Sequence, residues 1–200
     1  MDYIDKIFYI NLDHRTDRNI EIQRELENNG FSNYERFSAI HHPTIGGVGC
    51  GRSHIEVLQI AKERGYRCVM ILEDDFMFTE TPDNSKRLLS KLENLKFDVC
   101  LLSYNLLDSQ TTDCEFLIKI NKAQTTSGYV VNQHYYDTLI RTFEKATKKF
   151  EETNHHWVYA IDIAWNILQE MHTWYGFSPK LGKQRPSHSD CGNCFSEVEW

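Results

Sequence analysis

The feature that most constrains the fold is residues 68–78, where five apolar side chains lead directly into three consecutive carboxylates. The apolar run is rich in branched aliphatic residues, as is typical of a buried strand in a parallel sheet. Glu73, Asp74 and Asp75 are therefore predicted at the carboxyl end of that strand, where open α/β sheets bind their ligands. Because side chains alternate along a strand, Glu73 and Asp75 are expected on one face and Asp74 on the other.

Three adjacent negative charges repel one another, and each loses hydration where it lies against an apolar wall. A hard divalent ion such as Mn²⁺ or Mg²⁺, shared with the phosphates of a substrate, would compensate them. The alternative is a solvated turn that follows the strand. The apolar residues 76–78 favour the metal interpretation, because they bury the second flank of the acidic motif.

Strand-like and helix-like segments alternate along the rest of the chain, which predicts a parallel sheet flanked by helices, with added antiparallel strands in 103–132. Strands are expected at 7–12, 34–40, 68–72, 99–102, 116–120 and 126–131. Helices are expected at 16–29, 54–64, 82–95, 133–150 and from Asp162 onward. The glycine-rich stretch 43–51 is expected to be a loop, and the aperiodic residues 177–200 a tail or lid.

Composition narrows the class of protein. The formal net charge of -7 argues against a nucleic-acid partner, which would require a basic surface. No stretch approaches the roughly 20 apolar residues of a transmembrane helix. The first residues do not resemble a secretory signal, so a cytoplasmic location is expected.

Among the six cysteines, Cys68 and Cys100 are expected to be reduced core thiols. Cys191 and Cys194, with His188 nearby, are open to three interpretations: a zinc site, a disulfide or an inert tail.

Other residues are candidates for chemistry, each with a structural alternative. Arg15 and Arg18 follow the first strand and could bind phosphate or nucleotide, or be exposed charges of a first helical turn. His54 shares a helical face with apolar residues, so it is either a hydrogen-bonded core histidine or a ligand. Asp162 is either a helix N-cap or a general base. His188 could reach the metal if the tail closes as a lid.

Three segments together resemble glycosyltransferase family 25, which contains lipooligosaccharide and collagen galactosyltransferases. They are 8–18 (FYINLDHRTDR), 49–54 (GCGRSH) and 71–75 (ILEDD), and the first is the most specific. Weaker resemblances follow at Gly128, Tyr129, Asp162, Gln184, Ser189 and Asp190. The sequence departs from the family pattern at Gly51 and Arg52, which bear on the sugar preference, and at the pair Cys191 and Cys194.

The resemblance implies a GT-A-like α/β fold in a single domain over 1–200, a nucleotide-sugar donor that is usually a UDP-sugar, a divalent ion and inversion at the anomeric carbon. The expected metal ligands are Asp75, Glu73 and His188. The expected donor-binding residues are Asn11, Arg15, Arg18, His54, Glu73 and Asp74. Asp162 is the expected general base, because the acids of the central strand serve metal and donor.

The expected function is thus a Mn²⁺-dependent hexosyltransferase, with Mg²⁺ as the alternative ion. Its acceptor would be a hydroxyl group of a glycan, a lipid-linked glycan or a protein. Two other functions fit the same residues: a non-catalytic module that binds nucleotide sugar or metal, and a metal-dependent nucleotidyltransferase.

Overall fold

The structure is a computed structural model that describes residues 3–189 and 194–196, with side chains up to residue 186. Within these residues, six strands form the central sheet in the order β2-β1-β3-β6-β5-β7. The strands are β1 (Lys6–Asn11), β2 (Tyr34–Ser38), β3 (Cys68–Glu73), β5 (Val99–Thr111), β6 (Leu117–Asn132) and β7 (Trp174–Phe177). Strands β1, β2 and β3 are parallel, as are β5 and β7, whereas β6 runs antiparallel to its neighbours.

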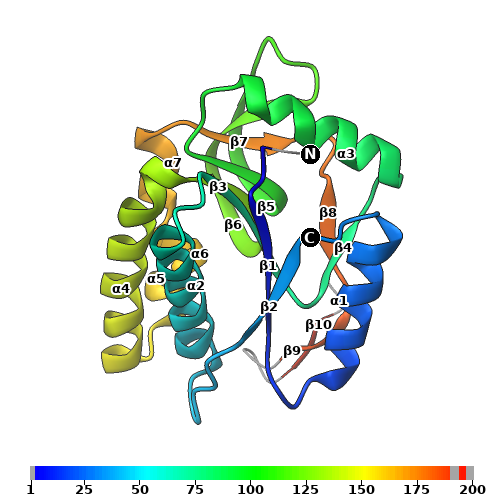
Figure 1. Cartoon of the computed structure of the whole chain (residues 1–200). Helices are drawn as coiled ribbons and strands as arrows, with labels where there is room; N and C mark the ends of the chain where they lie inside the picture. The colour runs from blue at the N-terminus through cyan, green and yellow to red at the C-terminus, as the bar shows by residue number, and fades with distance from the viewer. Residues whose placement is uncertain (1–2, 190–193, 197–200) are drawn as a thin grey trace.

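Helices cover both faces of the sheet and make a three-layer domain (Figure 1). One layer contains α2 (Gly46–Glu63), α4 (Tyr136–Thr153), α5 (His156–Tyr159), α6 (Ile161–Ala164) and α7 (Asn166–Met171). The other contains α1 (Thr16–Asn28), α3 (Pro82–Lys91) and a two-stranded ribbon of β4 (Phe76–Phe78) and β8 (Gly182–Gln184). No helix of the described chain is long and apolar enough to span a bilayer.

Residues 68–72 of β3 are all apolar because this strand supplies both hydrophobic cores. Val69 and Ile71 pack into the core beneath α2 and α4, and Met70 and Leu72 into the core beneath α1 and α3. The structure therefore confirms the predicted fold class, an α/β domain with a mostly parallel central sheet flanked by helices and joined by antiparallel strands. The two strands expected between 116 and 131 are one long strand, β6.

The glycine-rich stretch is the main correction to the predicted elements. It is not a loop, because α2 already begins at Gly46. A Cβ atom at Gly49 would collide with the backbone carbonyl oxygen of Ile40. At Gly47 and Gly51 it would collide with side chains of α4. The glycines thus cost helix propensity but let α2 pack closely against its neighbours.

We expect Gly49→Ala to destabilise the protein by about 1–3 kcal/mol, the usual cost of overpacking, although alanine is the better helix former. Chemical denaturation measures the change. Glu56→Ala, on the exposed face of the same helix, is the matched control and should change stability by less than about 0.5 kcal/mol. An equally small effect of Gly49→Ala would contradict this close packing.

The end of the chain also differs from expectation. The helix predicted from Asp162 is divided at the buried Trp165 into two short helices, and Ile167 and Met171 of the second are exposed. Residues 177–186 are built into the domain, because β8 pairs with β4 and Arg185 N donates to the backbone oxygen of Asp75 at 2.7 Å. Further on, β9 (Ser187–Ser189) pairs with β10 (Cys194–Ser196). The His188 side chain, Cys191 and the Cys194 side chain lie outside the described part.

Candidate functional site

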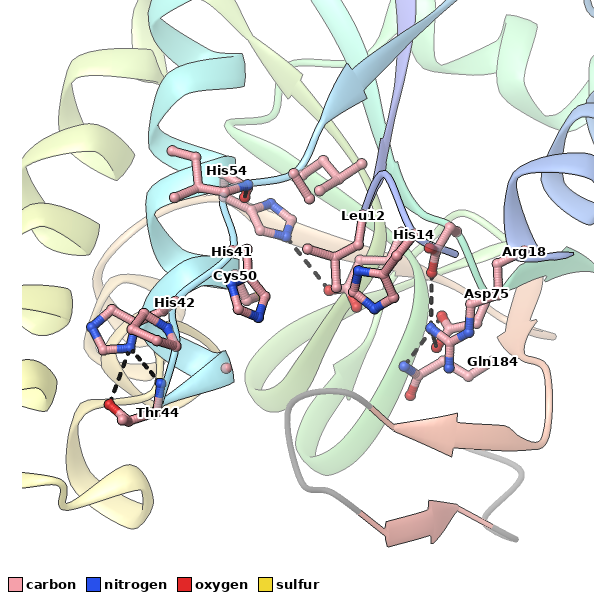
Figure 2. A pocket seen from close by; sticks show the side chains of 18 residues that line it. Leu12, His14, Arg18, His41, His42, Thr44, Cys50, His54, Asp75 and Gln184 are labelled. Carbon is pink, nitrogen blue, oxygen red and sulfur yellow. Dashed lines mark hydrogen bonds and ion pairs between the residues drawn. The ribbon is translucent and has the colours of Figure 1, made fainter. Parts of the chain in front are cut away.

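A cavity of about 460 Å³ opens at the carboxyl ends of β1, β2 and β3 (Figure 2). Its lining comes from the segment after β1, the segment after β2, the first turns of α2, the acidic motif and Gln184 of β8. Because parallel strands end at the same edge of the sheet, segments far apart in the sequence meet there. Arg18, His54, Glu73, Asp74 and Asp75, all predicted from the sequence, line this one cavity.

A buried guanidinium group lies beside two of the three carboxylates. Arg18 Nη1 lies 2.8 Å from Asp74 Oδ1 and 3.3 Å from Asp75 Oδ2. Asp74 also accepts a hydrogen bond from Asn11 Nδ2 at 2.7 Å. The predicted alternation is therefore wrong: β3 ends at Glu73 and the chain turns, so Asp75 shares Arg18 with Asp74 instead of a face with Glu73.

Glu73 has different partners. Its Oε1 accepts a hydrogen bond from the Thr126 hydroxyl at 2.6 Å and lies 3.5 Å from His54 Nε2. Burial alone would raise the pKa of Glu73, but its interactions with His54 and Thr126 outweigh burial and hold that pKa below the ordinary value. Glu73 is therefore the one carboxylate of the motif whose pKa lies below its ordinary value.

Asp75 carries the least compensated charge. Burial, and then the charge of Glu73, raise the pKa of Asp75 to about 7, although Arg18 acts in the opposite direction. Among the described residues, its Oδ1 has one hydrogen bond, a long one of 3.5 Å from Gln184 Nε2. These residues fit a divalent cation, because Asp75 and Glu73 offer carboxylate oxygens to the cavity and their negative charge exceeds what Arg18 supplies.

Two predicted donor-binding residues do not line the cavity. Asn11 is buried and positions its neighbours: its amide holds Asp74 and its Oδ1 accepts from Arg36 Nε at 2.9 Å. Arg15 forms a two-point pair with the exposed Asp17 at the start of α1, through Nε at 3.1 Å and Nη2 at 3.0 Å. Its contact with a donor stays a prediction.

Asp162 lies in the first turn of α6, but the residue before that helix is Ala160, so its interpretation as the N-cap is wrong. Its Oδ2 accepts a hydrogen bond from the backbone N–H of Thr125 at 3.1 Å. Thr125 has a φ of 84°, a conformation that L-residues seldom adopt. Burial, and also the charge of Glu73, raise the pKa of Asp162, opposite to the effect expected of a helix N-terminus. Asp162 does not line the cavity.

Sequence reasoning missed several residues of the cavity wall. His14, His41, His42 and Cys50 all line it, and Figure 2 places these side chains around the opening. The loop histidines carried no periodic signal that could place them. Cys50 did carry one, because it lies one helical turn before His54, but the expectation of a loop over 43–51 concealed it.

No family model and no curated protein sequence matches the chain. Among solved structures, A197 from STIV is similar at 14% identity and a TM-score of 0.51, over 90% of this chain and 85% of that one. Mannose-1-phosphate geranyltransferase from Thermus thermophilus matches at 7% identity and a TM-score of 0.48, over 88% and 73%. A glycosyltransferase involved in glycosylation of the major capsid of PBCV-1 matches at 11% and 0.45, over 77% and 73%. At these identities, what the chain shares with A197 is a fold.

Proposed function

We propose that the protein is a metal-dependent inverting glycosyltransferase of the family 25 type, which transfers a hexose from a UDP-sugar to a hydroxyl acceptor. The observation that carries this proposal is the position of the acidic motif: Glu73, Asp74 and Asp75 line a cavity at the carboxyl end of the central strand, next to a buried arginine. A cavity of about 460 Å³ is within the range of small-molecule sites.

Different residues of the site would contribute differently to binding an anionic donor. Asp75 and Glu73 would hold a divalent cation, Mn²⁺ or Mg²⁺, which would act as a Lewis acid on the diphosphate leaving group. Arg18 reduces the repulsion between Asp74 and Asp75, so that the motif can persist without a ligand. Gly46 at the start of α2 lines the same cavity, and the positive end of a helix dipole favours an anion.

An inverting transfer needs one base that removes the proton of the acceptor hydroxyl as it attacks. We infer that Asp162 is this base because it matches a position of family 25; burial, and also the charge of Glu73, raise its pKa. The hydrogen bond from Thr125 N–H holds one of its oxygens.

Asp162→Asn is expected to lower kcat by about 10²-fold or more and to leave the KM of the donor unchanged. Asparagine keeps an oxygen for Thr125 N–H, so the fold should be retained, as circular dichroism would verify. If turnover persists, the base must be sought at His54 or His188. If the variant fails to fold, Asp162 acts only as an anchor for the Thr125 backbone.

Donor hydrolysis tests the proposed function directly. The protein is incubated with UDP-sugars and, separately, with nucleoside triphosphates and sugar phosphates, with and without Mn²⁺. A transferase releases UDP slowly from its sugar nucleotide in the presence of Mn²⁺. Release of pyrophosphate from a triphosphate would instead indicate a nucleotidyltransferase, and binding without any release a non-catalytic module.

A further inference from the structure

Three side chains of unlike chemistry converge on one wall of the cavity. The Cys50 sulfur, a ring nitrogen of His54 and a carboxylate oxygen of Glu73 all lie within 4.8 Å of one another. Cys50 and His54 share a face of α2 because they are four residues apart, and Glu73 comes from the end of β3. All three residues line the cavity.

The surroundings of His54 are those of a metal-binding histidine. Its ring is fully buried, and Nδ1 lies 3.0 Å from the hydroxyl of the buried Tyr129. Nε2 is buried, has no hydrogen-bond partner in the part of the chain that the structure describes, and lies 3.5 Å from Glu73 Oε1. When Nδ1 donates to Tyr129, Nε2 carries the lone pair, which is the state that binds a metal.

We propose that Cys50, His54 and Glu73 form a site for a zinc-like transition-metal ion, with its fourth position open to the cavity. Sulfur, nitrogen and oxygen together suit Zn²⁺ and its relatives, whereas Mn²⁺ and Mg²⁺ prefer oxygen alone. With bond lengths of about 2.0–2.3 Å, the ligand atoms around a tetrahedral ion lie about 3.5 Å apart. The separation of His54 Nε2 and Glu73 Oε1 already has this value.

The supporting contacts are also in place. Thr126 donates to Glu73 Oε1 and orients that carboxylate, as Tyr129 orients His54. This site shares Glu73 with the cation of the proposed function but does not use Asp75, which faces Arg18 and Gln184. Three protein ligands with one open position are the arrangement of catalytic zinc sites, in which water or a substrate oxygen completes the coordination.

Cobalt(II) chloride, added to the reduced full chain, is the probe. If Co²⁺ binds the Cys50 thiolate, the protein should show visible d–d bands together with a near-ultraviolet sulfur-to-cobalt charge-transfer band. The assay uses a Cys191→Ser/Cys194→Ser background, because those thiols and His188 could also take up cobalt. In Cys50→Ser the charge-transfer band should disappear, and the Kd for Co²⁺ should rise about tenfold or more, as should the Kd for Zn²⁺ in competition.

Matched variants make the result decisive. Cys114→Ser, which changes another half-buried thiol outside the cavity, and Asp75→Asn should both keep the charge-transfer band. His54→Gln should lose the charge-transfer band. Because His54 is a core residue, near-ultraviolet circular dichroism of this variant without metal verifies that it is folded. Cys50→Ser tests the site independently of His54. Absence of the band in the parent protein, its persistence in Cys50→Ser, or its loss in Asp75→Asn alone would overturn the proposal.

Discussion

Asp75→Asn is expected to abolish Mn²⁺-dependent binding of a UDP-sugar while the protein stays folded. The substitution keeps the size of the side chain but removes the carboxylate charge on which a divalent cation depends. Calorimetric titration of the donor with and without Mn²⁺ measures the effect. Asp83→Asn, at an exposed position of α3, is the matched control and should bind like the parent. Undiminished donor binding or turnover in Asp75→Asn would contradict the assignment of Asp75 as a metal ligand.

The same substitution should stabilise the cation-free protein above neutral pH. The folded-state pKa of Asp75 is raised from its ordinary value of 3.8 to about 7, so the ionised carboxylate costs the folded state free energy that grows as pH rises between these values. Asparagine removes that cost. We expect its advantage in unfolding free energy to be about 1 kcal/mol or more at pH 8 and to vanish near pH 4, as denaturation at both pH values would show.

Arg18→Met is expected to lower the free energy of unfolding by about 3–5 kcal/mol, the cost of leaving buried charges without their partner. Arg18 is buried, and it lies within ion-pair distance of both Asp74 and Asp75. Methionine retains much of the apolar stem, so the loss reports the charge more than the packing. Urea denaturation near pH 7 is the measurement.

A double-mutant cycle provides the control for this prediction. Combining Arg18→Met with Asp74→Asn should cost less than the sum of the single substitutions, by about 1–3 kcal/mol, because the second removes one of the charges that the first exposes. Strict additivity would show that Arg18 and Asp74 do not interact energetically. A loss below about 1 kcal/mol in Arg18→Met would place this pair among weak surface ion pairs.

The sequence alone was sufficient for the central strand and for the carboxylates at its end. A run such as residues 68–72 has few alternatives, because five apolar side chains in a row must be buried on both faces of a sheet. The rule that parallel strands end at one edge of a sheet then predicts Arg18 and the acidic motif at the same edge. His54 was a candidate for a different reason, because it lies at helical spacing from apolar residues of one face.

Only the tertiary structure decided where each carboxylate points and what surrounds it. Alternation along a strand applies as far as Glu73, and the turn that follows depends on Arg18 and Asn11, which are distant in sequence. The glycines of α2 were wrongly expected in a loop for the same reason. They allow close packing against Ile40 and α4, and helix propensity, which is a local property, does not report such contacts. The convergence of Cys50, His54 and Glu73 likewise exists only once α2 packs against β3, because sequence patterns report local periodicity and a site is made by long-range contacts.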